Sequence, residues 1–137
     1  MLPEVDLNKV MLKNIRRSIN PGGHVAIVMP SLESFFYSGW RLIEWCNRQN
    51  EEVDMSDLSG FKGTKMDLIQ GIVRIDGVKT KHYLETELTV LFTEAGFTDV
   101  VIHKVEYDWT SEFSSPPKWM KEPYPWDWLI EAKSVRA

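Results

Sequence analysis

The residues best suited to bind a metal or to act as a nucleophile are few and lie far apart in the sequence. They are His24, His82, His103 and the single cysteine, Cys46. No two of them have the short spacing of zinc ligands, so the sequence predicts no metal site. Cys46 falls among apolar residues of an expected helix, where a buried thiol is usually inert. We therefore expect neither a metal centre nor a thiol nucleophile.

The short motifs that identify common reactions or cofactors are also missing from the sequence. It has no G-x-S-x-G nucleophile elbow, no phosphate-binding G-x-x-x-x-G-K-[ST] and no G-x-G-x-x-G fingerprint. Motifs alone therefore name no reaction.

Aromatic side chains are abundant, with six Trp, six Phe and four Tyr. Four of the tryptophans lie near the C-terminal end: Trp109, Trp119, Trp126 and Trp128. Tryptophan buries a large apolar area and needs a partner for its indole N–H. Two interpretations stay open. These residues supplement the core of a small sheet, or they form an aromatic wall around an apolar or planar ligand.

The composition restricts the class of protein. The chain has 137 residues, a net charge of −4, 43% hydrophobic residues and 26% charged residues, which fits one globular domain and excludes disordered or collagen-like classes. The negative charge argues against a nucleic-acid-binding surface, and the lone cysteine argues against a disulfide scaffold. No apolar run reaches the roughly 20 residues of a membrane span, and residues 1–6 do not resemble a signal peptide. We expect a soluble, cytoplasmic protein without a nucleic-acid or membrane partner.

Hydrophobic spacing predicts a helix over residues 7–19 that stops at Asn20-Pro21-Gly22-Gly23. The apolar run 24–29 that follows is typical of a strand covered on both faces, as in a parallel sheet. After it we expect an insertion or lid over about 31–80. The insertion would contain a helix at 32–49, a polar loop at 50–63 and a short strand at 71–78 with a turn at Asp76-Gly77.

The rest of the sequence predicts one more helix and two strands. Apolar spacing indicates a helix over 84–95 that ends at Gly96. Strands are expected over 100–109 and 126–135, joined by a long Ser/Pro-rich connection.

Three segments of the chain resemble class I S-adenosylmethionine-dependent methyltransferases. Residues 12–25 (LKNIRRSINPGGHV) are similar to a helix-and-strand segment of that family. Glu87-Leu88, Leu91 and Ala95-Gly96-Phe97 resemble its next helix, and residues 126–129 (WDWL) resemble its closing strand. The resemblance implies an α/β fold, namely a partial doubly wound Rossmann-like sheet with a C-terminal antiparallel strand and a helical insertion. It also implies a single, partial methyltransferase-like domain over residues 1–137.

The sequence departs from the family's pattern in two places. It lacks the glycine-rich loop that holds the methionyl end of the cofactor, and it lacks the acidic residue that binds the ribose hydroxyls. S-adenosylmethionine is therefore implied by the resemblance only, with no cofactor-binding residue and no metal. In a third departure, Leu84 stands where the family often has a capping Thr or Ser, so we expect Thr86 to cap the helix instead.

The resemblance implies the substrate-side half of a methyltransferase acting on a small molecule, inactive without the missing cofactor-binding half. A non-catalytic binding or interaction module derived from the same fold is the alternative. An independent aromatic-pocket ligand binder is a third possibility.

The candidate substrate-binding residues follow from the expected fold, because ligands of open α/β sheets bind beyond the carboxyl ends of the strands. His82 is also a candidate general base for an acceptor hydroxyl or amine, although a surface histidine bonded to its loop fits the sequence too. Tyr37 and Trp40 have an equally simple interpretation as core residues. The full set is Ser31, Glu33, Ser34, Tyr37, Trp40, His82 and Tyr83.

The resemblance also predicts an open edge. In this fold the final strand runs antiparallel and inserts between the two strands before it in sequence, which leaves the strand at 24–29 on a border. That strand carries no fixed charge, proline or bulge signal between its ends. We expect it to recruit a partner strand, from a second copy or from a complementary subunit, unless residues 71–78 cover it.

Overall fold

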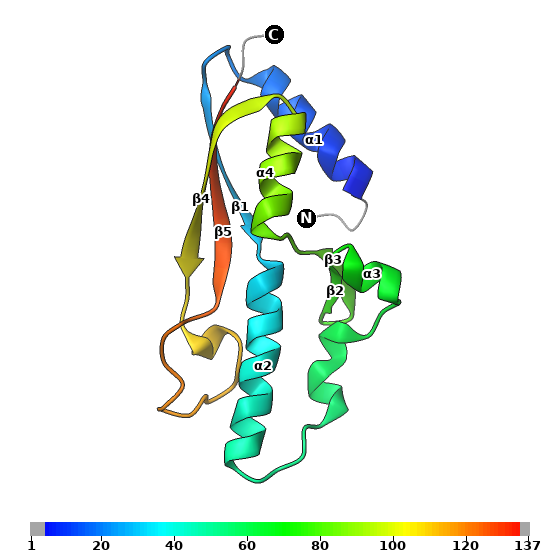
Figure 1. The fold of residues 1–137 in the computed structure, drawn as a ribbon, viewed down its shortest axis with the longest axis vertical. Coiled ribbons are helices and arrows are strands. Elements are labelled where there is room, and N and C mark those ends of the chain that lie inside the picture. The colour runs from blue at the N-terminus through cyan, green and yellow to red at the C-terminus, as the bar shows by residue number, and fades with distance from the viewer. Residues whose placement is uncertain (1–4, 135–137) are drawn as a thin grey trace.

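The computed structural model describes residues 5–134 and is built on a three-stranded sheet (Figure 1). The strands are β1 (His24–Pro30), β4 (Phe97–Glu106) and β5 (Trp126–Ser134). Their order is β1-β5-β4, and β5 is antiparallel to both neighbours. β1 and β4 are therefore parallel to each other. The prediction that the last strand inserts between the other two is confirmed.

Two helices cover one face of this sheet: α1 (Val5–Ser18) and α4 (Glu85–Glu94) (Figure 1). Side chains alternate between the two faces of a strand, so every second strand residue points toward these helices. The buried core that results combines one stripe from each helix with the inward residues of the strands. Its members include Leu12, Met29, Leu88, Leu91, Phe92, Phe97, Trp128, Ile130 and Ala132.

The opposite face of the sheet is largely exposed. Val28 is 57% exposed, and Val101 and Val105 of β4 are also exposed on this side. The prediction that the strand at 24–29 is covered on both faces is wrong for residues 5–134. An apolar run indicates that both faces are suited to burial, but it does not require the second cover to lie among the described residues.

The turn between α1 and β1 depends on two glycines. Gly22 has a φ of +80°, which strains any residue with a Cβ, and its N–H donates to the Ser134 carbonyl at 3.1 Å. A Cβ on Gly23 would lie 2.5 Å from Cγ2 of Ile19. The predicted helix stop at residues 20–23 is confirmed, and the glycines let the chain reverse directly into the sheet.

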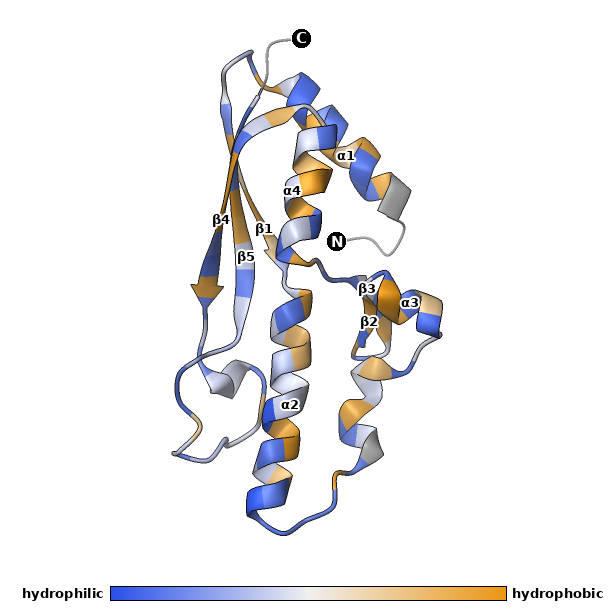
Figure 2. Cartoon of the chain, viewed as in Figure 1, coloured by the Kyte–Doolittle hydropathy of each residue, from blue (hydrophilic) through white to orange (hydrophobic). Residues whose placement is uncertain are grey.

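The insertion between β1 and α4 begins with a long helix, α2 (Leu32–Arg48), which extends beyond the end of β1 (Figure 1). Hydrophobic and hydrophilic residues are interspersed along α2 (Figure 2). Short helices η1 (Met55–Phe61) and α3 (Lys65–Ile69) follow. Half of the segment at 50–63 that was expected to be a loop is therefore occupied by η1. The side chain of Asp54 starts that helix by accepting from the N–H of Ser56.

A hairpin completes the insertion. Its strands are β2 (Ile72–Ile75) and β3 (Val78–Lys81), and the turn residues Asp76 and Gly77 have φ values of +50° and +79°. Positive φ at both positions is typical of the tight hairpin turn that Asp-Gly favours, so the predicted turn is confirmed. The hairpin forms its own two-stranded sheet and does not cover the edge of β1. The described contact of β-type between the two segments is one isolated parallel bridge, in which Ser31, just after β1, pairs with Tyr83, just after β3.

The connection from β4 to β5 starts earlier than expected. β4 ends at Glu106, and Trp109 opens a short helix, η2 (Trp109–Ser111), because the side chain of Asp108 caps it. Trp109 is fully buried, its indole N–H donates to the Lys121 carbonyl at 2.8 Å, and its ring stacks on Phe113. Trp109 is thus a core residue of this connection.

Within residues 5–134, no helix has the length and hydropathy of a membrane span.

Candidate functional site

The parallel strands β1 and β4 end at the same edge of the sheet, where the insertion and the β4–β5 connection begin. A cleft of about 270 Å³ lies between these two segments. We call it the Phe35 cleft. α2, η1, the β2–β3 hairpin and the β4–β5 connection all contribute to it. Its lining residues are Phe35, Ser38, Gly39, Leu42, Asp57, Leu58, Gly60, Phe61, Arg74, Ile75, Asp76, Glu112 and Phe113.

The wall of the Phe35 cleft is aromatic and closely packed. The rings of Phe35 and Phe61 lie 4.7 Å apart, centre to centre. A Cβ on Gly60 would lie 2.5 Å from Phe35 and 3.0 Å from the Arg74 carbonyl, and one on Gly39 would lie 3.0 Å from Phe61. The two glycines therefore allow η1 to approach α2 and close one side of the cleft.

Ser38 lines the cleft, and its hydroxyl oxygen is buried without a partner. The residue is only 8% exposed, and its hydroxyl has no hydrogen-bond partner among the described residues. An unpaired buried hydroxyl costs about 1–3 kcal/mol of desolvation that no partner offsets.

Three carboxylates line the cleft with one guanidinium. Asp57, Asp76 and Glu112 are all exposed. Arg74 donates from Nε to the Lys62 carbonyl at 2.7 Å. Glu112 accepts from the hydroxyl of Tyr107 at 2.8 Å, and burial together with that carboxylate holds the pKa of Tyr107 above its ordinary value. The cleft carries a net negative charge.

The three polar residues expected just after β1 are engaged within the fold. Ser31 accepts from the N–H of Ser34 and so caps α2. Ser34 in turn accepts from the N–H of Trp126, at the start of β5, at 2.9 Å. Glu33 accepts from the N–H of Glu85, at the start of α4, at 3.0 Å. Together these bonds link α2 to β5 and α4.

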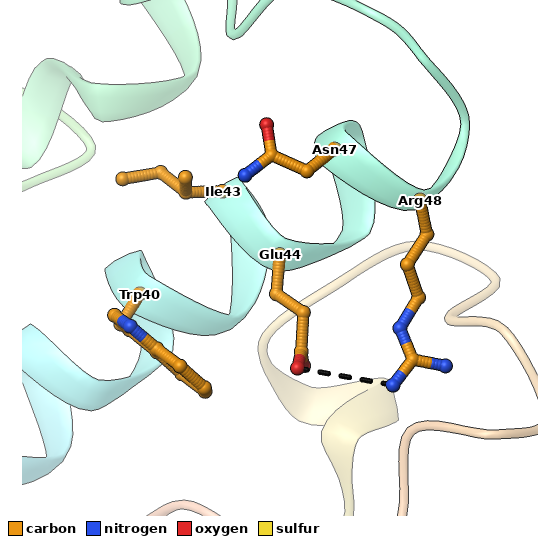
Figure 3. A pocket seen from close by; sticks show the side chains of 5 residues that line it. All are labelled: Trp40, Ile43, Glu44, Asn47 and Arg48. Atoms are coloured by element: carbon orange, nitrogen blue, oxygen red, sulfur yellow. Dashed lines mark ion pairs between the residues drawn. The ribbon is translucent and has the colours of Figure 1, made fainter.

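Tyr37 packs among the aromatic residues of the β4–β5 connection. Its hydroxyl donates to the Pro123 carbonyl at 2.7 Å, and its ring lies 5.5 Å from that of Trp109. Trp40, one turn further along α2, is 57% exposed and lines a separate groove of about 320 Å³ with Ile43, Glu44, Asn47 and Arg48 (Figure 3). The ion pair of Glu44 with Arg48, at 3.8 Å, balances the charge of this groove.

His82 and Tyr83 both lie inside the protein. His82 packs edge-on against Phe35 and does not line the cleft, and its Nδ1 has no partner among the described atoms. Burial lowers the pKa of His82 from 6.5 to about 4. The hydroxyl of the fully buried Tyr83 accepts from the side chain of Asn8 at 2.7 Å. Of the seven predicted residues, none lines the Phe35 cleft and only Trp40 lines the second groove.

A buried ion pair was not expected from the sequence. Lys81 is 1% exposed, and its Nζ lies 2.7 Å from Oε2 of Glu87 and also donates to the Gln70 carbonyl. Glu87 also accepts from the N–H of Leu84. Leu84 is therefore the N-cap of α4, and the prediction that Thr86 caps this helix is wrong. The pair ties the hairpin to α4. Among residues 5–134, no group of His, Cys, Asp and Glu could hold a metal.

Comparison with known proteins supports the fold. No protein-family model and no curated protein matches the chain. A solved structure described as a SAM-dependent methyltransferase from Methanosarcina mazei is similar, with a TM-score of 0.57 and 15% sequence identity. The match covers 98% of this chain and 54% of that protein, so the chain spans about half of its relative's length. The chain therefore has an α/β fold similar to part of a methyltransferase.

Proposed function

We propose that the chain forms the acceptor-binding half of a S-adenosylmethionine-dependent methyltransferase that acts on a small molecule. The observation that carries the proposal is the strand order β1-β5-β4, with one antiparallel strand between two parallel ones, in a fold similar to about half of such an enzyme. In methyl transfer the cofactor supplies an already activated methyl group. The protein mainly aligns the reactants and excludes water. The Phe35 cleft would hold the acceptor.

The described residues do not fit the cofactor itself. A glycine-rich turn between a strand and a helix would let a ligand approach the backbone closely. After β1, however, the free amides at the start of α2 are partly taken up by Ser31. At the start of α4 the N–H groups of Leu84 and Glu85 bond to Glu87 and Glu33. We therefore assign the cofactor to a complementary half.

β1 is where that complementary half would attach. The Gly23 carbonyl accepts from Ser134 on the β5 side, whereas the Pro30 carbonyl accepts from Tyr83 on the other side. Backbone groups alternate between the two edges of a strand, so Ala26 and Val28 direct theirs to the open edge. The outer edge of β4 differs, because its bulge after Thr98 and its charged residues discourage pairing.

An exposed apolar groove on α1 also supports the proposal that a complementary half attaches next to β1. A helix that connects two parallel strands packs over both of them, and among the described residues α1 leads into β1 with no strand before it. Leu7 and Val10 are each about half exposed. They line a shallow apolar groove of about 540 Å³ with Met11, Asn14, Ile15, Ser18 and Ile19. A strand added to β1 would lie next to this groove and shield it.

The test is methyl transfer in the presence and absence of the complementary half. The chain alone is titrated with S-adenosylmethionine by calorimetry, and we expect no saturable binding. The chain is then co-expressed with the polypeptide encoded directly upstream, and transfer of radiolabelled methyl groups to small molecules is measured. Cofactor binding and transfer by the pair would support the proposal. An upstream sequence without a strand and a glycine-rich loop, or a pair that binds no cofactor, would contradict it.

The alternative function is a non-catalytic interaction module derived from the same fold. The capped helix starts described above favour it, because residues 5–134 supply no cradle for a cofactor. A complex that forms through β1 but transfers no methyl group would identify this alternative.

A further inference from the structure

We infer that the apolar groove on α1 binds an amphipathic helix that carries carboxylates beside its apolar face. Leu7 and Val10 are the most exposed apolar residues of this groove, which we call the α1 groove. The inference rests on the proposed function for the origin of the helix, which would belong to the complementary half. It adds the shape and the charge of the segment that this half presents to α1.

The shape of the α1 groove suits a second helix. Its lining residues recur with the period of α1 from Leu7 to Ser18, over three turns and about 16 Å at 1.5 Å per residue. Leu7 and Val10 are each about half exposed, and Met11 and Ile15 are half-buried. A ridge of side chains from another helix packs into a groove of this kind.

The position of α1 in the fold also favours a helix. α1 lies on the side of α4 away from β4, and β1 is the strand at the open edge of the sheet (Figure 1). Helices that cover the same face of an α/β sheet lie side by side. A strand paired with β1 would extend the sheet past α1, and the helix connected to that strand would lie against the α1 groove.

The charge of α1 contrasts with that of the chain. Residues 7–18 contain two lysines and two arginines but no carboxylate, whereas the whole chain has a net charge of −4. Among the described side chains, no ion pair involves α1. Arg16 and Arg17 suit the C-terminal end of the helix dipole, but Lys9 and Lys13 lie too far from that end to gain from it.

Two of these cations border the α1 groove. Lys13 follows Val10 by three residues, and Arg17 follows Asn14 by three, so each cation lies beside a lining residue on the surface of the helix. Both cations are exposed. Carboxylates on a helix in the groove could reach them while its apolar side chains cover Leu7. Such exposed pairs add little affinity each, and they mainly raise the association rate and the specificity.

A polypeptide fits this surface better than a lipid bilayer or a nucleic acid. Ala26 and Val28 direct unpaired backbone groups to the open edge of β1, and such groups are costly in hydrocarbon. Nucleic acids bind basic surfaces mainly through their phosphates and would leave Leu7 and Val10 uncovered. A polypeptide can both pair with the strand edge and fill the groove.

Two synthetic peptides test the charge preference of the full-length chain. Each is an amphipathic helix of about 18 residues with leucines on one face; the acidic probe carries Glu beside the leucines, and the basic probe carries Lys. In calorimetry at low salt, we expect the acidic probe to bind about 10-fold more tightly, although the net charge of the chain would favour the basic one. The preference should fall to about 2-fold at high salt, which screens exposed charges. Amide NMR should place the shifts at residues 7–19.

Two variants locate the source of the preference. Lys13→Glu with Arg17→Glu should reverse it, so that the basic probe binds more tightly, a result that loss of structure would not produce. Lys118→Glu with Lys121→Glu is the matched control. It changes the net charge by the same amount at exposed positions of the β4–β5 connection and should retain the preference for the acidic probe. Circular dichroism checks that both variants keep the wild-type helix content.

The possible outcomes separate this inference from the proposed function. The inference would be overturned by absence of binding of the acidic probe at millimolar concentration, by tighter binding of the basic probe to the wild type, or by a preference that Lys13→Glu with Arg17→Glu leaves intact. Tighter binding of phosphatidylglycerol vesicles or of a short DNA duplex than of the acidic probe would also overturn it. Amide shifts at residues 7–19 that grow with the concentration of the chain alone would assign the groove to a second copy instead.

None of these results decides whether the chain and its upstream partner transfer methyl groups. A chain that prefers the acidic probe but whose upstream partner transfers no methyl group would retain the inference and refute the proposed function.

Discussion

His82 is a histidine that folding keeps neutral. It is 8% exposed, its ring packs against Phe35, and burial lowers its pKa from 6.5 to about 4. A base with so low a pKa holds no proton near neutral pH and accepts one reluctantly. The titration of His82 is therefore more informative about stability than about catalysis.

The stability of the fold should fall with acid because of His82. Above pH 6.5 the imidazole is neutral in both the folded and the unfolded chain, so it imposes no cost. As the pH falls from 6.5 to 4, the unfolded chain takes up a proton that the folded chain does not. The free energy of unfolding should drop by about 3 kcal/mol over this window. Urea denaturation of the wild type and of His82→Gln between pH 8 and pH 4 measures the difference.

The matched control is His103→Gln, since His103 is exposed and pairs with Glu131 on the surface of the sheet. We expect that variant to retain the wild-type pH dependence. A wild-type curve that parallels the His82→Gln curve throughout would contradict the prediction.

Trp40 and Trp109 should differ strongly when each is replaced by Ala. Trp40 is 57% exposed and stacks loosely on Tyr37, with 6.4 Å between ring centres. Trp109 is fully buried and bonded to a backbone carbonyl. We expect Trp109→Ala to cost about 3–5 kcal/mol and Trp40→Ala about 1 kcal/mol in chemical denaturation. A Trp40 loss as large as that of Trp109 would show that Trp40 belongs to the core.

At the level of single residues, the sequence selected other positions of α2 than those that line the Phe35 cleft. Tyr37 and Trp40 were selected because they lie outside the main apolar stripe of α2. The cleft is instead formed by Phe35, Ser38 and Leu42, on the side that η1 covers. No pattern in the sequence reports that a serine hydroxyl is buried without a partner, since that depends on the packing of η1 against α2.

Among the elements, the contact between the hairpin and α4 depends on Lys81 and Glu87. Lys81 is 1% exposed, whereas Glu87 is 32% exposed. Removal of Glu87 would leave a buried lysine that water does not reach. Removal of Lys81 would leave a glutamate that water partly solvates, so the two losses have unequal consequences.

A double-mutant cycle tests that asymmetry. Glu87→Gln should cost about 3 kcal/mol, Lys81→Met about 1 kcal/mol, and the double variant should return to within about 1 kcal/mol of the wild type. Equilibrium denaturation measures all three. If the two single losses simply add in the double variant, the residues are not coupled.

Elements with strong periodicity were predicted well, and the short polar ones were not. The helix at 7–19, the helix at 32–49 and the last strand correspond to α1, α2 and β5. The elements η1 and α3 were not predicted because they occupy polar sequence without a clear apolar period. The side chains of Asp54 and Thr64 cap them. Lys81 was missed for a related reason: a lysine in a short strand normally indicates exposure, and its burial depends on Glu87 from a separate element.

At the scale of the whole molecule, the main consequence of the strand order is that β1 lies at an edge of the sheet, where a strand from another chain can pair with it. Light scattering of the purified chain should detect dimers or larger assemblies at high concentration. Val28→Lys, on β1, should shift the distribution toward monomer, because a charge on an edge strand discourages pairing. Val101→Lys, on β4 and 48% exposed, should not. A stable wild-type monomer at high concentration would contradict the prediction.

The arrangement of the sheet was predictable from the resemblance, and the position of the hairpin was not. Two strands of similar hydrophobicity, at 24–29 and 71–78, could have paired in the same sheet. The Ser31–Tyr83 bridge and the Lys81–Glu87 pair hold the hairpin past the end of β1, so the open edge remains. Such long-range contacts have no signature in local sequence.

The central position of β5 also decides when this protein can fold. β1 and β4 do not pair with each other, and each bonds only to β5 within the three-stranded sheet. The partners of β1 on β5 lie about one hundred residues later in the chain, from His24 with Lys133 to Pro30 with Asp127. During biosynthesis, neither strand can acquire its sheet partner until the segment 126–134 has left the ribosome. Contacts of such long range also slow folding. The nascent chain therefore exposes the apolar side chains of β1 until the segment 126–134 emerges, and chaperones have that interval in which to bind them.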